Sequence, residues 1–136
     1  MRQLQVSLGL IQKGEDYFLQ LRGDNPAIGA AGLIGTFGGK IEVGEQSDEA
    51  VSREIGEETS LATKPKDFTF IGDVTVISDY QNVKTEIVAS VFKLALPDDT
   101  LVIAKEGRLV VMTKEAALRD RHRLTPATRV VFEELI

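Results

Sequence analysis

The segment that most constrains this chain covers residues 39–61, GKIEVGEQSDEAVSREIGEETSL, because its glutamates recur at helical spacing. Glu54, Glu57 and Glu58 would lie on one face of a helix, since side chains three and four positions apart are neighbours there. Like charges at such spacings destabilise an isolated helix by about 0.2–0.5 kcal/mol per pair. A divalent cation would remove this repulsion, and hard ions such as Mg²⁺ prefer oxygen ligands. The spacing alone therefore leaves two interpretations, a solvated acidic helix face or a metal site.

The residues around these glutamates favour the metal site. They follow the pattern Gly-x5-Glu-x7-Arg-Glu-U-x-Glu-Glu-x-Gly-U of the Nudix box, in which U is aliphatic. The matching residues are Gly39, Glu45, Arg53, Glu54, Ile55, Glu57, Glu58 and Leu61. Ser60 replaces the last glycine of the box, and a helix C-terminus that favours glycine accepts another residue at a modest cost. The chain therefore resembles the Nudix hydrolases, a family that cleaves nucleoside diphosphates linked to some other group.

Composition narrows the chemistry that is available. The chain has 136 residues, no cysteine and one histidine, His122. This length predicts a single domain over residues 1–136. Without cysteine, disulfides, zinc thiolate sites and thiol catalysis are excluded, and one histidine disfavours a histidine-rich metal site. Any catalysis must then be carried out by carboxylates, Lys, Arg, Tyr and metal.

The charge and hydropathy of the chain bear on its partners. The net charge of −5 at pH 7 disfavours a module that binds duplex nucleic acid. A small phosphorylated substrate is compatible with it, because a bound cation changes the local sign of the charge. No apolar run approaches the ~20 residues that cross a bilayer, and the N-terminus lacks a signal-peptide pattern. We therefore expect a cytoplasmic protein without a membrane partner, and the sequence leaves its oligomeric state open.

The chain is expected to alternate between strands and helices. The expected strands cover residues 4–11, 17–21, 33–37, 68–77, 85–96 and 109–112. The expected helices cover residues 47–59 with Ser47 or Asp48 as the N-cap, residues up to Leu118 after a Thr113 cap, and residues from Pro126 to Ile136. A long loop over residues 23–35 is the best candidate for a substrate-side element. The order predicts an α/β (α+β) fold with a mixed β-sheet and helices on both faces, which resembles the Nudix α/β/α sandwich.

The resemblance also implies a set of metal ligands. Gly38 and Gly39 lie where the backbone must turn tightly before the helix, and glycine there leaves a carbonyl free to ligate metal. The resemblance implies that the ligating carbonyl is that of Gly38 and that Glu54, Glu57 and Glu58 supply carboxylates. The implied ion is Mg²⁺, with Mn²⁺ as the alternative. Such an ion neutralises phosphate charge and lowers the pKa of bound water.

Three box residues are predicted to be catalytic, namely Arg53, Glu54 and Glu57. Arg53 is expected to orient a neighbouring carboxylate through a charge-assisted hydrogen bond. Its alternative role is an i,i+4 surface ion pair with Glu57. In MutT-like members of the family the glutamate matching Glu54 is the general base, although ligation and base action compete for the same oxygens. Glu45 is expected to be structural and to tie the loop to the helix.

Segments outside the box extend the resemblance to MutT-like members. Leu19-Gln20-Leu21-Arg22 places Arg22 where those proteins have a substrate-side arginine. Ala104-Lys105-Glu106-Gly107 resembles Gly-Lys-Glu-Gly and implies Glu106 as a further metal ligand, although such an acid by itself is more often a solvated turn residue. Residues 124–128, Leu-Thr-Pro-Ala-Thr, resemble a Phe-Pro-Pro-Ala-Asn segment of MutT-like members, in which the asparagine binds the oxidised guanine. Thr128 stands in place of that asparagine and is the implied substrate-binding residue. A hydroxyl cannot reproduce the donor and acceptor pair of an amide, so selectivity for oxidised guanine is not expected.

Aromatic residues are the least decisive signal. Tyr80 lies near the position where diadenosine-polyphosphate enzymes of the family carry a tyrosine, but it is interpreted as a turn aromatic between two strands. Phe37, Phe70 and Phe92 fit either a base pocket or ordinary core packing. The leading functional prediction is metal-dependent hydrolysis of a phosphoanhydride bond in a nucleoside diphosphate-linked substrate, such as a dNTP or a nucleotide sugar. The alternatives are a catalytically silent Nudix-fold nucleotide sensor and a purely structural acidic domain.

Overall fold

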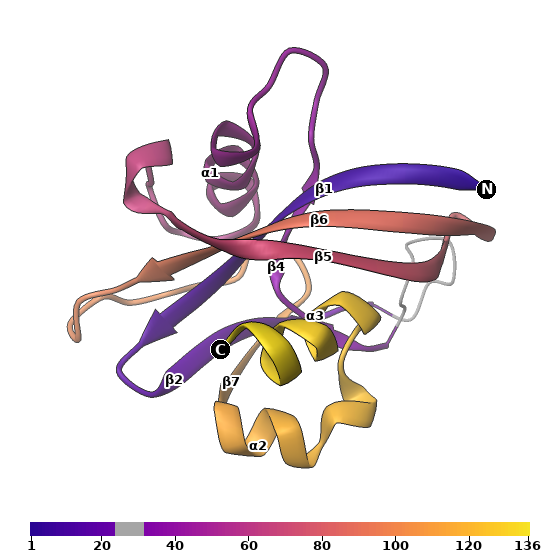
Figure 1. Cartoon of the computed structure of the whole chain (residues 1–136). Coiled ribbons are helices and arrows are strands. Elements are labelled where there is room, and N and C mark those ends of the chain that lie inside the picture. Colours follow the sequence, from indigo (N-terminus) through magenta and orange to yellow (C-terminus); the bar gives the residue numbers. More distant parts are fainter. Residues whose placement is uncertain (24–31) are drawn as a thin grey trace.

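The computed structural model describes residues 1–23 and 32–136 of the chain, so most of the predicted substrate-side loop lies outside the described residues (Figure 1). The strands are β1 (Arg2–Lys13), β2 (Asp16–Leu21), β3 (Ile34–Gly35), β4 (Phe37–Lys40), β5 (Thr69–Tyr80), β6 (Val83–Ala95) and β7 (Arg108–Thr113). The α-helices are α1 (Ser47–Glu58), α2 (Lys114–Arg119) and α3 (Pro126–Val130). Short helical turns are η2 (Pro65–Asp67), η3 (Arg121–Arg123) and the π-helical η4 (Val131–Leu135).

The strands form one mixed sheet in which β1 is central. β1 runs parallel to β6 along its whole length and antiparallel to β2 and β4 on its other side. β5 lies antiparallel to β6, while β3 and β7 both pair with β2. The mixed sheet predicted from the sequence is therefore confirmed. Because β4 pairs with residues 6–9 of β1, the glycines of β4 lie against the middle of the sheet.

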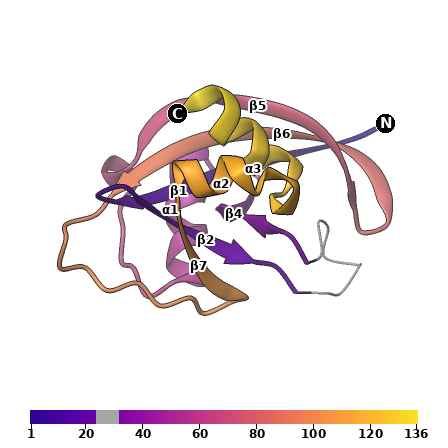
Figure 2. The ribbon, with the colours of Figure 1, turned by 90° about the horizontal axis from the view of Figure 1, so that it is seen from below.

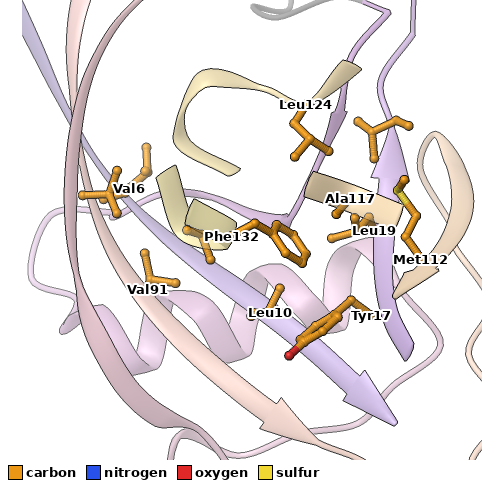
Figure 3. Close-up of a cluster of buried hydrophobic side chains, with 13 residues drawn as sticks. Val6, Leu10, Tyr17, Leu19, Val91, Met112, Ala117, Leu124 and Phe132 are labelled. Carbon is orange, nitrogen blue, oxygen red and sulfur yellow. The ribbon is translucent and has the colours of Figure 1, made fainter. Parts of the chain in front are cut away.

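Helices cover both faces of this sheet, as predicted (Figures 1 and 2). On one face, α1 packs through Val51 and Ile55 on a cluster that contains Phe37 and Phe92. On the other face, α2, α3 and η4 close a second cluster, with Phe132 at its centre (Figure 3). Phe37 and Phe92 are thus core residues, and Phe70 is 53% exposed. The structure favours the core interpretation for Phe37 and Phe92.

Close packing sets the position of α1. Ala50, Val51 and Ile55 are fully buried, and a Cβ on Gly9 of β1 would lie 2.9 Å from the Ile55 Cδ1 atom. Glycine at that position allows the helix to approach the strand closely. Gln46 is the N-cap in place of the predicted Ser47 or Asp48, because its backbone N–H is satisfied by the Glu49 carboxylate at 2.8 Å. Such reciprocal contacts of the first turn stabilise a helix start.

Other boundaries differ from the sequence prediction for local reasons. The expected strand over residues 33–37 is divided at Thr36 into β3 and β4, which pair with different strands. The expected link over residues 78–82 shrinks to Gln81 and Asn82, whose φ angles of 52° and 62° are left-handed. A two-residue hairpin turn with this backbone matches the twist of the flanking strands. Tyr80 is therefore the last residue of β5 and not a turn residue.

The C-terminal helix is short and changes its geometry. Thr125 caps α3 through a hydrogen bond from the Thr128 N–H, and Pro126 occupies its first turn. The chain then continues as the π-helical turn η4. Within residues 1–23 and 32–136, no helix is long and apolar enough to cross a membrane.

Candidate active site

A pocket of about 620 Å³ brings together most of the predicted site residues. Its acidic end holds Glu54 and Glu58 from α1 and Glu106 from the loop before β7. Backbone of Gly38 and Gly39 forms the adjoining wall. The rest of the lining includes Arg22, Thr36, Thr128, an apolar stretch of β1, β5 and β6, and the end of the β5–β6 hairpin.

The glycine pair is required by its surroundings. Gly38 has a φ of 147°, and a Cβ there would come within 2.2 Å of the Ser7 carbonyl oxygen. Its N–H donates a 2.8 Å hydrogen bond to Glu58 Oε1. A Cβ on Gly39 would lie 2.7 Å from the Glu54 carboxylate. β4 therefore presents bare backbone directly to two carboxylates of α1, and the use of the Gly38 carbonyl as a metal ligand stays a prediction.

Glu54, Glu57 and Glu58 of α1 do not share one environment. Glu58 is 7% exposed, and the Glu54 side chain is 15% exposed. Glu57 lies at the rim, with its side chain 56% exposed and outside the pocket lining. The expectation that all three point into one site thus holds for Glu54 and Glu58, because these two flank the buried stripe of the helix.

Arg53 connects the box loop to the helix. Its Nε and Nη2 atoms donate to the two carboxylate oxygens of Glu45 at 2.8 and 3.0 Å. Nη1 donates to Glu54 Oε1 at 2.9 Å, and Nη2 also donates to the Lys40 carbonyl at 3.0 Å. Glu57 lies farther away, at 3.4 Å. A two-pronged Arg–carboxylate pair fixes orientation as well as charge, so Arg53 holds Glu54 in place while Glu45 anchors the guanidinium.

Glu106 is far from α1 in sequence but is attached to it by backbone contacts. The Lys105 N–H donates to the Glu58 carbonyl at 2.7 Å. On the other side, the Gln20 side chain donates to the Glu106 carbonyl at 3.0 Å. Gly107 has a φ of +66°, and a Cβ there would lie 2.7 Å from the Leu21 carbonyl oxygen. These contacts hold the loop between α1 and β2 and place Glu106 at the acidic end of the pocket.

The electrostatics of this acidic end are unfavourable for carboxylates alone. Burial raises the pKa of Glu58 to about 8, and the charges of Glu54 and Glu106 add to the rise. The Gly38 N–H and the Arg22 charge oppose it. Burial also raises the pKa of Glu54, against the hydrogen bond and charge of Arg53. Because a nearby cation favours the charged form of a carboxylate, this end is suited to bind one.

The oxygen atoms at the acidic end are of the kind that binds a hard divalent cation. Carboxylate and backbone carbonyl oxygens are the ligands that Mg²⁺ uses in proteins, and Glu54, Glu58 and Glu106 repel one another in its absence. In the described part of the chain, however, no three acidic or histidine side chains form a complete metal cluster. The roles of Gly38, Glu54, Glu57, Glu58 and Glu106 as ligands stay predictions.

Thr128 lines the pocket, but its hydroxyl is engaged within the protein. The residue is 1% exposed, and its Oγ1 accepts hydrogen bonds from the Thr36 N–H at 3.0 Å and from the Thr125 hydroxyl at 2.8 Å. A hydroxyl has two acceptor lone pairs, so Thr128 has none left to accept from a substrate. Sequence reasoning missed Thr36, whose buried Oγ1 has no hydrogen-bond partner among the described residues.

The fold and the acidic pocket agree with the comparisons to known proteins. A family model described as the NUDIX domain matches residues 1–135. The chain belongs to the NUDIX family. The sequence prediction of a Nudix hydrolase is thereby confirmed at the level of the family.

Solved structures with the same fold include several Nudix enzymes. A MutT protein from Methanosarcina mazei Go1 aligns with a TM-score of 0.78 and 23% identity over 98% of this chain and 93% of that one. The E. coli dihydroneopterin triphosphate pyrophosphohydrolase aligns with a TM-score of 0.69 and 24% identity over 97% and 94%. A bifunctional NMN adenylyltransferase/ADP ribose pyrophosphatase from Francisella tularensis, complexed with AMP and a manganese ion, aligns with a TM-score of 0.68 and 15% identity over 98% and 42%.

A search of curated proteins found no match. At these identities the structural matches establish the shared Nudix α/β/α fold.

Proposed function

We propose that this Nudix protein hydrolyses a phosphoanhydride bond in a nucleoside diphosphate-linked substrate, with Mg²⁺ or Mn²⁺ bound at the acidic end of its pocket. The observation that carries the proposal is the convergence of Glu54, Glu58 and Glu106 beside the bare backbone of Gly38 and Gly39. The printed names of two relatives, a triphosphate pyrophosphohydrolase and an ADP ribose pyrophosphatase, support the same reaction class.

The metal, when bound, would neutralise phosphate charge and supply an activated water. The residues that would hold it are Glu54, Glu58 and Glu106, with the carbonyl of Gly38 and, from the rim, Glu57. Arg22 lines the same pocket, and its charge acts on Glu58, so it is placed to contact the substrate phosphates. These contacts would position the phosphoanhydride at the acidic end.

Glu54 is the residue best placed to take a proton from the attacking water. Its Oε1 is held by Arg53 Nη1 at 2.9 Å, and a Cβ on Gly39 would lie 2.7 Å from its carboxylate. Burial raises the pKa of Glu54, which makes its carboxylate a stronger base than an exposed one. Glu57, which is more exposed, would assist ligation from the rim. Arg53 is a positioning residue, because its contacts are to Glu45, Glu54 and backbone.

The test is the release of phosphate or pyrophosphate from dNTPs, oxidised dNTPs, nucleotide sugars, ADP-ribose and dinucleoside polyphosphates, with Mg²⁺ or Mn²⁺. A coupled phosphatase would reveal monophosphate products. We expect turnover of one class, and Glu54→Gln should lower kcat by about 10²–10⁴-fold, the usual contribution of general base catalysis. Glu115→Gln, an exposed acid on α2, is the matched control and should retain full activity.

Two outcomes would count against the proposal. Equal losses in Glu54→Gln and Glu115→Gln would remove Glu54 from the reaction. No turnover in the panel, together with nucleotide-dependent thermal stabilisation, would favour the nucleotide sensor. The cytoplasmic location stays a prediction from the sequence.

A further inference from the structure

The position at which this chain departs from the Nudix box lies where α1 ends. Thr59 is the C-cap residue and has an extended backbone, and its N–H and its hydroxyl both donate to the Ile55 carbonyl, at 2.9 and 2.7 Å. Within the described residues, a positive φ occurs outside glycine only at Gln81 and Asn82. Ser60 therefore has an ordinary backbone, and the conformational freedom of the glycine that it replaces is not required here.

The side chain of Ser60 makes a contact that a glycine could not make. Its Oγ accepts a 2.9 Å hydrogen bond from the Ile103 N–H, and the Ser60 N–H donates to the Ile103 carbonyl at 2.9 Å. The neighbouring residues Thr59 and Ala104 form an antiparallel bridge. The hydroxyl thus completes a reciprocal pair of hydrogen bonds between the end of α1 and the loop before β7. With glycine at position 60, the Ile103 N–H would lose this acceptor.

The pairing with α1 continues along the loop towards Glu106. The Lys105 N–H donates to the Glu58 carbonyl at 2.7 Å, and Lys105 Nζ donates to the Gly56 carbonyl at 3.4 Å. Because α1 has no basic residue in its own last turn, Lys105 brings a positive charge to the negative end of the helix dipole. The loop is therefore attached to α1 at Ile103 and Lys105, and Glu106 is the next residue in the chain.

The hydrogen bond to Ser60 lies at the surface and not in the core. Ser60 is exposed, and Ile103 is 55% exposed, whereas Val102 is buried in the cluster below α1. Exposed segments with few buried contacts open at a lower free energy than the whole domain. Loss of the Ser60 hydroxyl should therefore loosen residues 103–106 locally and leave the core packed.

We propose that Ser60 is a positioning residue for Glu106. Its hydroxyl keeps the loop against the end of α1 and so keeps the Glu106 carboxylate beside Glu54 and Glu58, where the divalent cation binds. This inference rests on the proposed function, because it requires a metal at the acidic end of the pocket. Ser60 itself lies outside the pocket lining, so the affinity of the site for metal should depend on a side chain that does not touch the ion.

Metal binding can be measured without substrate and without turnover. Electron paramagnetic resonance of free Mn²⁺ gives the Kd of the wild type and of each variant. Ser60→Ala and Ser60→Gly should raise this Kd by about 2- to 10-fold, the loss expected when one hydrogen bond no longer favours the binding-competent loop. Ser60→Thr retains the hydroxyl and should restore most of the affinity.

Ser52→Ala is the matched control for these variants. The Ser52 hydroxyl also joins α1 to the segment that follows it, through the Thr63 carbonyl at 3.0 Å and the Thr63 hydroxyl at 3.1 Å. It makes no such link to the loop before β7. Ser52→Ala should therefore lower thermal stability and leave the Kd for Mn²⁺ unchanged.

Two further measurements test whether Ser60 acts through Glu106. In a Glu106→Gln background, Ser60→Ala should have little further effect on the Kd for Mn²⁺, because the effects of coupled residues are not additive. Amide hydrogen exchange reports on the loop itself. In Ser60→Ala the N–H groups of Ile103 and Lys105 should exchange faster than in the wild type, while those of Val51 and Ile55 in the buried part of α1 stay unchanged.

The outcomes separate this inference from the proposed function. An unchanged Kd in Ser60→Ala, an equal rise in Ser52→Ala, no rescue by Ser60→Thr or full additivity with Glu106→Gln would each overturn the positioning role, even if hydrolysis is confirmed. Absence of Mn²⁺ binding by the wild type would overturn it as well. A weaker affinity in Ser60→Ala that disappears in the Glu106→Gln background would support the role, even if no compound of the panel is hydrolysed.

Discussion

Arg53 and Arg2 each organise one end of the same pocket, but in different chemical surroundings. Arg53 donates to the carboxylates of Glu45 and Glu54 and to the Lys40 carbonyl. Arg2 contacts the neutral Tyr80 and Thr85. Arg53 therefore balances charge where the carboxylates gather, and Arg2 braces a surface at the apolar end.

The two arginines also differ in how far along the chain they reach. The carboxylates that Arg53 holds lie one and eight positions away. The groups that Arg2 contacts lie 78 and 83 positions away. A charged cluster built from neighbouring residues depends on the local backbone of the box, whereas the Arg2 contacts exist only after β1, β5 and β6 have paired. We expect the carboxylate end to be the more sensitive to substitution.

The largest effect is expected where the backbone meets the carboxylates. Gly38→Ala should lower the free energy of unfolding by about 2–4 kcal/mol, since its φ of 147° suits only glycine and a Cβ would overlap the Ser7 carbonyl. Gly14→Ala is the control, because Gly14 also has a positive φ but has open space around it, and it should cost only about 1 kcal/mol. Urea denaturation measures both. Equal losses would mean that the close approach at Gly38 adds nothing.

Replacement of the two arginines compares the two ends directly. Arg53→Met should lower the free energy of unfolding by about 1–3 kcal/mol, because the carboxylates of Glu45 and Glu54 and the Lys40 carbonyl lose their hydrogen-bond donor. It should also reduce kcat, since Glu54 loses the contact that orients it. Arg2→Met should cost less than about 1 kcal/mol, as expected of an exposed contact. Denaturation and steady-state kinetics together test this order, and a larger stability loss in Arg2→Met would reverse the comparison.

The Glu45–Arg53 pair predicts a dependence of stability on pH. The hydrogen bonds from Arg53 lower the pKa of Glu45 from 4.5 to about 2. Because the folded pKa lies below the unfolded one, the stabilisation by Glu45 is fully present above pH 4.5 and is lost as the pH falls towards 2. The stability difference between the wild type and Glu45→Gln should therefore shrink across this window. A difference that stays constant down to pH 2 would contradict the pairing.

The smallest effect concerns the threonines between the two ends. Thr36→Val should raise the free energy of unfolding by up to about 1 kcal/mol, because the Thr36 Oγ1 is buried without a partner. Thr128→Val should instead lower it by about 1–2 kcal/mol, since the Thr36 N–H loses its acceptor. Thermal or urea unfolding of both variants measures whether the two changes in the free energy of unfolding have opposite signs. Stabilisation by both would show that the Thr128 hydroxyl is dispensable.

Much of the fold followed from local patterns. The positions of α1 and of the long strands were predictable because apolar residues recur with the helical or the strand period. The Thr113 cap was also predicted correctly, as its hydroxyl accepts from the Ala116 N–H at 3.1 Å. The division at Thr36 was missed, since β3 and β4 differ only in their pairing partners and local propensity does not encode partners.

The site, like the fold, has features that local sequence predicted and features that depended on long-range packing. An orienting contact from Arg53 to a neighbouring carboxylate and a tie of Glu45 between the box loop and the helix were both anticipated from the box pattern, and the structure shows Arg53 bonded to Glu54 and Glu45. The exposure of Glu57 was not, because it depends on which face of α1 the sheet covers. Tyr80 was interpreted as a turn residue, and its place in the pocket lining depends on the tight Gln81–Asn82 turn and on Arg2.

The sequence by itself determined the family, the order of the main strands and helices and the spacing of the acidic residues on α1. These features depend on side-chain periodicity and short-range geometry. Only the tertiary structure decided that Glu106 joins Glu54 and Glu58, that the Thr128 hydroxyl is internally bonded and that Arg2 braces Tyr80. Each of these contacts joins segments far apart in the chain, and their formation depends on the packing of the whole sheet.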